Sequence, residues 1–235
     1  MNKNYLKNLE AVLFDLDGTL MDTLPGLTQL VNAVRRDFDK RPLPEEEVGR
    51  YIGKGMLVLI NRAMTRTMDE KLSEDIFNIA LDSLYKHISR NQYDKGTPYK
   101  GVISSLQKLK DTGMTIGVVT NKPYEMTLEV LKSKDMLSLF DFIVGGDSAP
   151  APKPAADPVL LALKKAHTTP EKALFVGDSG NDSQAALAAG VPCVLVRTGW
   201  SEGISLSEIQ KRDKVDAIFN DVPDVVSAIL TAKQN

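Results

Sequence analysis

The sequence predicts an α/β protein, a doubly wound parallel sheet with an inserted helical domain. Two observations support this fold class. From about Pro98 onward, short apolar runs alternate with segments of helical periodicity, and near-continuous apolar runs are typical of parallel strands covered on both faces. Residues 22–95 contain no comparable apolar run, and their apolar side chains recur at helical spacing.

Short apolar runs predict the strands of the sheet. They are residues 11–14, 115–119, 141–145, 173–177, 192–196 and 216–219. Helical patterns separate several of these runs, at residues 102–110, 123–134, 158–166 and 181–189. Gly113 and Gly190 follow the first and last of these patterns, and glycine after the last periodic residue is a signal for the end of a helix.

The segment after the first strand is predicted to be a helical insert. Its apolar positions at helical spacing are Leu27, Leu30, Val31 and Val34, then Ile76, Ile79, Ala80, Leu84 and Ile88. We therefore divide the chain into an α/β core, residues 1–21 and 97–235, and a helical cap domain, residues 22–96, called the insert below. The alternative is an elongated crossover within one domain.

Composition argues against several functional classes. Of 235 residues, 43% are hydrophobic and 26% are charged, as in ordinary globular proteins. The net charge of −2 provides no general basic surface for nucleic acid or membranes. No apolar run approaches the roughly 18 residues of a membrane span, and residues 1–11 lack the apolar segment of a signal peptide. The single cysteine, Cys193, lies in an apolar run and is expected to be buried. We expect a cytoplasmic protein without nucleic-acid or membrane partners, and its oligomeric state is open.

Polar side chains gather where three predicted strands end. They are Asp15 and Asp17 after the first, Thr120 and Asn121 after the second, and Asp178 and Asp182 after the fourth, with Lys153 in a separate proline-rich loop. Each one alone could be a turn or helix-capping residue. Ligands, however, collect at the carboxyl ends of parallel strands, and converging carboxylates need a cation. Oxygen ligands suit Mg²⁺, while Thr120, Lys153 and backbone N–H groups suit a phosphate. The pattern therefore predicts a magnesium–phosphate site.

Four segments in order carry a family resemblance: DLDGTLMDT, VVTN, Lys153-Pro154 and GDSGND. Together they resemble the motifs of the haloacid dehalogenase-like hydrolase superfamily and span the predicted core. DTLPGL, the helical insert behind it and KPAADPVLLAL resemble bacterial phosphoglycolate phosphatases. These relatives more usually carry KPxPxPL, which is replaced here by Ala155-Ala156-Asp157. The resemblance implies a Rossmann-like hydrolase core and a small phosphorylated metabolite as substrate.

The resemblance also implies a role for each acidic residue. Asp15 would be the nucleophile that forms an aspartyl-phosphate, and Asp17 the general acid and base. Mg²⁺ would be held by Asp15, the backbone carbonyl of Asp17 and Asp178. Asp182 would orient Asp178 or a metal-bound water.

The remaining predicted residues would bind the substrate. Thr120, Asn121 and Lys153 would hold the phosphate. In the insert, the loop 51–56 is the candidate for recognising the rest of the substrate. Lys54 in this loop would contact a substrate carboxylate, with Arg50 and Arg62 as alternatives.

Three functions remain open at this point. The favoured one is a Mg²⁺-dependent phosphomonoesterase, with 2-phosphoglycolate as the first candidate substrate. The second is a sugar-phosphate phosphomutase, or a sibling phosphatase for a nucleotide, pyrophosphate or a sugar phosphate. Thr19-Leu20 after DxDG argues against a mutase, because family mutases tend to carry other residues there. The third is a non-catalytic regulator that binds Mg²⁺ or phosphate, which would not need both a nucleophile and a general acid.

Overall fold

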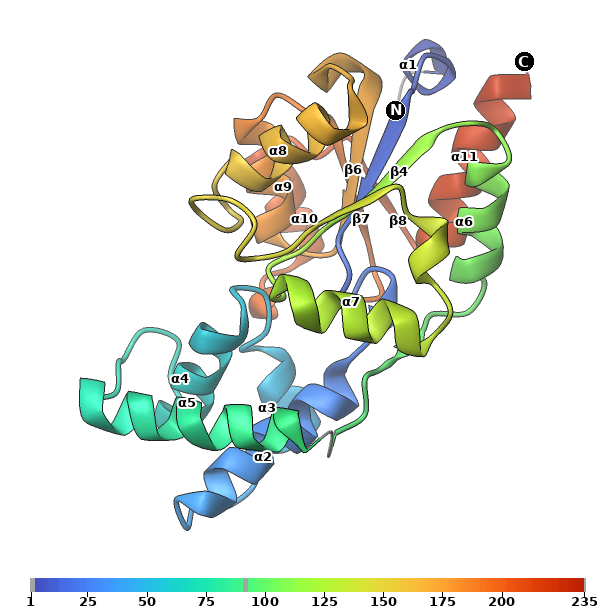
Figure 1. Ribbon diagram of the computed structural model, residues 1–235. Coiled ribbons are helices and arrows are strands. Elements are labelled where there is room, and N and C mark those ends of the chain that lie inside the picture. The colour runs from blue at the N-terminus through green and yellow to red at the C-terminus, as the bar shows by residue number, and fades with distance from the viewer. Residues whose placement is uncertain (1–2, 91–92, 235) are drawn as a thin grey trace.

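A six-stranded parallel sheet forms the centre of the protein (Figure 1). The computed structural model describes residues 3–90 and 93–234. In chain order the strands are β1 (Ala11–Phe14), β4 (Thr115–Val119), β5 (Phe142–Val144), β6 (Ala173–Gly177), β7 (Cys193–Val196) and β8 (Ala217–Phe219). All the strands predicted from the apolar runs are confirmed.

The strand order β5–β4–β1–β6–β7–β8 places β1 between the two halves of the sheet. The chain first builds outward from β1 through β4 to β5. It then returns to the other side of β1 and builds outward again through β6, β7 and β8. This reversal is the doubly wound topology, and ligands bind beside the point where the order reverses. The carboxyl ends of β1, β4 and β6 flank that point.

Helices cover both faces of the sheet. On one face lie α1 (Lys3–Lys7), α6 (Val102–Lys110), α7 (Tyr124–Ser133) and α11 (Val222–Gln234), and on the other α8 (Asp157–Ala166), α9 (Gly180–Ala188) and α10 (Leu206–Asp213). Adjacent residues of β1 pack on opposite faces of the sheet, because side chains alternate along a strand. Phe14 belongs to the first apolar cluster and Leu13 to the second.

Four predicted helices, now α6 to α9, are confirmed, whereas α1, α10 and α11 were not predicted. The signal for α11 was available, because Val222, Val225, Val226 and Ile229 lie at helical spacing and are all buried. Short 3₁₀-helices occur at Leu137–Leu139, Pro170–Lys172 and Ser201–Gly203. No helix in the described part of the chain is long and apolar enough to cross a membrane.

The insert contains α2 (Leu24–Asp37), α3 (Glu45–Gly49), α4 (Met56–Thr65) and α5 (Glu74–Ser89), which lie together beyond one end of the sheet (Figure 1). These helices share an apolar cluster of their own. The chain enters and leaves the insert through β2 (Met21–Asp22) and β3 (Thr97–Pro98), which pair antiparallel. The fold class, including the helical insert, is therefore confirmed, and the domain boundaries at 21/22 and 96/97 stay a prediction.

The apolar residues that recur at helical spacing in α5 differ in burial. Ala80 and Leu84 are fully buried, whereas Ile76 is 43% exposed and Ile79 is 59% exposed. The apolar stripe in the sequence is therefore wider than the face of α5 that the insert covers. Cys193, in contrast, is a buried free thiol as predicted.

Candidate active site

The sheet register brings three of the predicted site residues to one edge. Phe14 pairs with Val118 of β4 and with Val176 of β6. Asp15 follows β1 directly, and Thr120 and Asp178 follow the ends of β4 and β6. Their positions agree with the expectation that polar residues after parallel strands converge.

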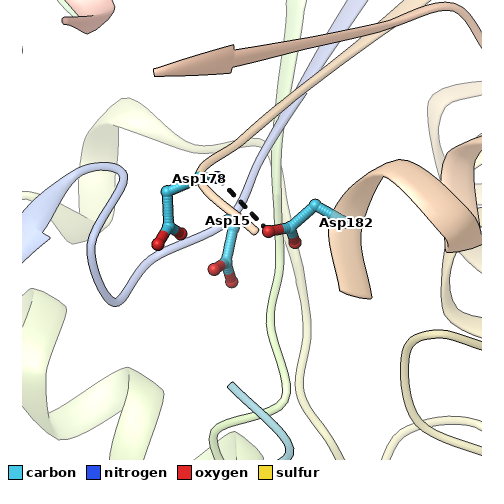
Figure 2. A group of neighbouring side chains, drawn as sticks. All are labelled: Asp15, Asp178 and Asp182. Atoms are coloured by element: carbon cyan, nitrogen blue, oxygen red, sulfur yellow. Dashed lines mark hydrogen bonds between the residues drawn. The ribbon is translucent and has the colours of Figure 1, made fainter. Parts of the chain in front are cut away.

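Three carboxylates gather at this edge, those of Asp15, Asp178 and Asp182 (Figure 2). Each offers an oxygen, and these oxygens lie within 4.8 Å of one another. The side chains come from the ends of β1 and β6 and from the first turn of α9. All three are buried, so their mutual repulsion is poorly screened by water.

Lys153 is the cation at the centre of this cluster. Its ammonium group contacts Asp15 Oδ1 at 2.9 Å and Asp182 Oδ1 at 2.6 Å. It also donates to the backbone carbonyl of Val119 at 2.8 Å. Burial by itself lowers the pKa of this lysine, but the two carboxylates outweigh burial and raise its pKa above the ordinary value. Lys153 is therefore charged and fixed in place.

One ammonium group does not balance three buried carboxylates. Burial raises the pKa of Asp15 to about 6, against the counteracting charge of Lys153. Burial, followed by the charges of Asp182 and Asp15, raises the pKa of Asp178 well above its ordinary value. Both pKa shifts show that ionised carboxylates are costly in this buried cluster, and an oxygen-liganded divalent cation fits three carboxylates that share one ammonium group.

The hydrogen bonds of Asp182 distinguish it from the other two carboxylates. Its Oδ1 is bonded to Lys153, and its Oδ2 accepts from the backbone N–H groups of Asp178 and Ser179 and from the Ser179 hydroxyl. Ser179 and Asp182 form a capping box at the start of α9. A side chain at Gly177 would collide with Asp182, since an added Cβ would lie 2.4 Å from its Cβ and Cγ. With both oxygens engaged, Asp182 is suited to orienting the loop of Asp178, and this role stays a prediction.

Asp178 is held from two directions. Thr19 Oγ1 donates to its Oδ1 at 3.1 Å, and the Trp200 backbone N–H donates to its Oδ2 at 3.1 Å. Gly18 has φ +86°, and an added Cβ there would lie 2.7 Å from Asp178 Oδ2. Only glycine accommodates both the positive φ and this close approach.

Asp17 is fixed by two residues that were not predicted as part of the site. Thr23 Oγ1 donates to its Oδ1 at 2.7 Å, and Lys122 Nζ donates to its Oδ2 at 2.9 Å. The signal for Lys122 was its place directly after Thr120 and Asn121 at a strand end. Thr23 had no comparable signal in the sequence. It does not follow one of the predicted strands, and the short strand β2 separates it from Asp17.

Thr120 and Asn121 are neighbours with different bonding. The Thr120 hydroxyl accepts from the Lys122 backbone N–H, so its own hydrogen can be donated. The Asn121 amide group donates to the carbonyls of Gly53 and Lys153 and accepts from the Lys153 N–H. Asn121 therefore links the insert to the Lys153 loop, and its predicted contact with phosphate stays a prediction.

A cavity lies between this edge of the core and the insert. The core lines it with Asp15, Asp17, Thr120, Lys122 and Lys153, among others. The insert lines it with Leu27, Ile52, Gly53, Gly55, Met56 and Leu59. Trp200 of the core also lines the cavity, and its ring approaches Gly49 of α3.

The cations expected from the insert lie elsewhere. Lys54 is exposed and is not among the described residues that line the cavity. Arg50 pairs with Glu46 on the surface. Arg62 is buried, but it forms an ion pair with Glu202 of the core at 2.7 Å. The structure thus gives no support to Lys54, Arg50 or Arg62 as a carboxylate-binding residue.

The chain belongs to the haloacid dehalogenase-like hydrolase family, whose model matches residues 12–196. This match confirms both the family resemblance and the expectation of an enzyme of the hydrolase class.

Particular relatives are phosphoglycolate phosphatases. The chain is 37% identical to the phosphoglycolate phosphatase of Nitrosospira multiformis over 201 residues, covering 86% of this chain and 88% of the relative. It is 34% identical to that of Thiobacillus denitrificans over 229 residues, covering 97% of each. A crystal structure of a predicted phosphoglycolate phosphatase from Haemophilus somnus superposes with a TM-score of 0.84 at 32% identity, covering 94% of this chain and 97% of that one.

Proposed function

We propose that the protein is a Mg²⁺-dependent phosphomonoesterase that hydrolyses a small organic phosphate through an aspartyl-phosphate, with 2-phosphoglycolate as the favoured substrate. The observation that carries this proposal is the different bonding of the two carboxylate oxygens of Asp15. One of its oxygens is held by Lys153, and no hydrogen bond among the described residues engages the other. That second oxygen belongs to a side chain that lines the cavity, as a nucleophile requires.

In the first step, the free oxygen of Asp15 forms a bond to phosphorus while the bond from phosphorus to the ester oxygen breaks. Asp17 gives its proton to the departing oxygen, which leaves as an alcohol. In the second step, Asp17 takes a proton from water, and the water oxygen displaces Asp15 from phosphorus. Phosphate is released and Asp15 is regenerated. Splitting the displacement into two steps is the advantage of covalent catalysis.

The hydrogen bonds of Asp17 fix its position for the proposed proton transfer. Thr23 and Lys122 each hold one of its oxygens, which fixes the carboxylate beside Asp15 and the cavity. Positioning of this kind is a large part of the effect of a general acid or base.

The phosphate group would meet Thr120 and Lys153 at the same edge. The free hydroxyl hydrogen of Thr120 can be donated to a phosphate oxygen, and Lys153 contributes a fixed positive charge beside Asp15. A preorganised hydroxyl donor and a fixed positive charge stabilise the charge of a phosphoryl-transfer transition state.

We assign the metal site to Asp15, the backbone carbonyl of Asp17 and Asp178. The shortage of positive charge in the buried cluster supports this assignment. A bound Mg²⁺ would supply the charge that reduces repulsion between the Asp15 carboxylate and the substrate phosphate.

A phosphate-release screen tests the proposal. The panel contains 2-phosphoglycolate, an aryl phosphate, a sugar phosphate, a nucleotide and pyrophosphate, each with Mg²⁺ and with a chelator. We expect Mg²⁺-dependent release, with the highest kcat/KM for 2-phosphoglycolate. Conversion of a sugar phosphate to an isomer that retains its phosphate would instead identify a phosphomutase. Absence of phosphate release from every ester would overturn the proposal.

A further inference from the structure

The cavity holds few cations, although a substrate such as 2-phosphoglycolate carries a second negative group besides its phosphate. Of the described residues that line the cavity, Lys122 and Lys153 are the cations, and both come from the core. The side chains that the insert contributes are apolar, and its two other lining positions are glycines. Among these lining residues, recognition of a second anion by a cationic side chain therefore falls to one of these two lysines.

Lys153 has no capacity left for a second anion. An ammonium group has three N–H donors. Those of Lys153 are matched by three acceptors, the carbonyl of Val119 and one oxygen each of Asp15 and Asp182. A new ligand would have to displace one of them, which would leave a buried group without its partner.

Lys122 has spare capacity. Its side chain is only 5% exposed, and its ammonium group donates to Asp17 Oδ2 at 2.9 Å. No other acceptor of this ammonium group occurs among the described residues. Two donors of a nearly buried cation that lines the cavity are thus free for a ligand, and buried donors are normally bonded.

The position of Lys122 follows from its contact with Asp17. In the proposed reaction Asp17 touches the ester oxygen that leaves. In 2-phosphoglycolate the carboxylate carbon is separated from that oxygen by a single methylene carbon. A cation bonded to Asp17 therefore lies in the region where a carboxylate on the leaving alcohol must come to rest.

We propose that Lys122 is a specificity-determining residue whose ammonium group binds an anionic group on the leaving alcohol, the carboxylate in 2-phosphoglycolate. This inference rests on the proposed function, because it takes Asp17 as the acid beside the leaving oxygen. It also changes the origin of specificity that the sequence indicated, from a cation in the insert to a cation in the core. The insert then contributes apolar walls and excludes water around the charge pair.

The test compares two esters of similar size, 2-phosphoglycolate and 2-hydroxyethyl phosphate, in which a neutral hydroxymethyl group replaces the carboxylate. Lys122→Met removes the charge and keeps an unbranched stem. We expect its kcat/KM to fall at least about tenfold more on 2-phosphoglycolate than on the neutral ester, as for one lost charge-assisted hydrogen bond. Lys122→Arg should restore part of the preference. The matched control is Lys54→Ala, an exposed cation outside the cavity lining, which should leave the ratio between the two esters unchanged.

Binding measured without turnover keeps the test decisive if Lys122→Met is inactive. In an Asp15→Asn background, calorimetry with Mg²⁺ should show that Lys122→Met weakens 2-phosphoglycolate by at least about tenfold and the neutral ester by less. Equal losses on both esters, in rate and in binding, would reduce Lys122 to a residue that positions Asp17 and overturn the inference. A wild-type protein that releases phosphate from none of the esters in the screening panel would overturn the proposed function instead, so the two failures are distinguishable.

Discussion

The core and the insert face each other across one cavity and line it with opposite chemistry. The core side carries four carboxylates and two ammonium groups, and hydrogen bonds fix their positions. The insert side carries leucine, isoleucine and methionine side chains and two glycines. The core is also organised around a sheet with apolar clusters on both faces, whereas the insert is a set of helices around a single cluster.

This difference indicates that the core and the insert have different roles. The charged groups of the core lie directly after buried parallel strands, as for Asp15 and Asp178, or are tied to that edge by hydrogen bonds, as for Lys153, and these constraints fix their positions. The insert supplies surfaces that can cover a substrate and exclude water, a role that tolerates more movement. Substitutions in the core should therefore have large effects on turnover or on stability. Substitutions in the insert should have smaller effects, mainly on substrate affinity.

The largest effect is expected for Asp15→Asn, which replaces the proposed nucleophile by a weakly nucleophilic amide. Turnover should fall by about 10⁴-fold or more, and acid quenching should trap no phosphate on the protein. Asp17→Asn keeps the attacking oxygen and loses proton transfer, so turnover should fall by about 10²- to 10⁴-fold. The measurements are phosphate release and the mass of the quenched protein. Equal and mild defects in the two variants would contradict the division of roles.

Lys153→Met tests how much the cation in the carboxylate cluster contributes to the free energy of unfolding. Removing this cation leaves the Asp15 and Asp182 carboxylates buried without their partner, and the free energy of unfolding should fall by about 3–5 kcal/mol. Lys172→Met is the matched control, because Lys172 pairs with Glu10 on the surface, where both side chains are about half exposed. Its loss should cost about 0–1 kcal/mol. Urea unfolding measures the free energy of unfolding of both variants. Similar losses in the two would contradict the role of Lys153 as the counter-charge of the buried carboxylates.

Metal binding should stabilise the protein more at higher pH. Burial raises the pKa of Asp15 to about 6 from an ordinary value of 3.8. Between these two values the folded chain holds more protons than the unfolded chain, so the stability of the metal-free protein falls as pH rises through this window and remains lower above it. In the proposed site, Mg²⁺ would reduce the cost of the ionised carboxylates. Its effect on Tm should therefore be larger at about pH 8 than at about pH 5.

Asp178→Asn sharpens the same prediction. It removes one buried charge, and its amide can still accept from the Trp200 N–H and donate to Thr19. The metal-free variant should have a higher Tm than the wild type at about pH 8, and Mg²⁺ should raise that Tm much less. The control is Asp224→Asn, an exposed carboxylate in α11. An unchanged Mg²⁺ effect in Asp178→Asn would rule out Asp178 as a ligand.

The smallest effect is expected where the two regions meet. Glu202 of the core pairs with Arg62 of the insert, and both side chains are largely buried. Glu202→Gln keeps a hydrogen-bond acceptor but removes the charge, so KM should rise by about three- to tenfold with little change in kcat. Glu46→Gln, which affects an exposed pair within the insert, should change KM less than about twofold. A larger loss in kcat than in KM would show that this contact serves the chemistry and not the position of the insert.

Much of the site was predictable from particular residues. The run Ala11–Phe14 is buried on both faces, and the apolar pattern alone indicates such a strand. Asp15, Thr120 and Asp178 were expected together because parallel strands end at a common edge. The acidic residue Asp182 was correctly placed in the first turn of a helix. Ile76 and Ile79 are exposed although they recur at helical spacing, because periodicity shows which residues share a helix face, while neighbouring helices decide how much of that face is covered.

By itself, therefore, the sequence determined the parallel sheet, the position of the insert in the chain and the set of acidic residues at the strand ends. These features depend on local patterns and on the geometry of parallel strands. Only the tertiary structure decided which side chains meet. Lys122 reaches Asp17 across 105 residues, Asn121 bonds to Gly53 across 68, and Arg62 pairs with Glu202 across 140. Such partners are set by how the loops of the core and the helices of the insert pack in space, and no local periodicity carries that information. That packing makes Asn121 a link between the core and the insert, and it brings the ammonium group of Lys122 to the cavity.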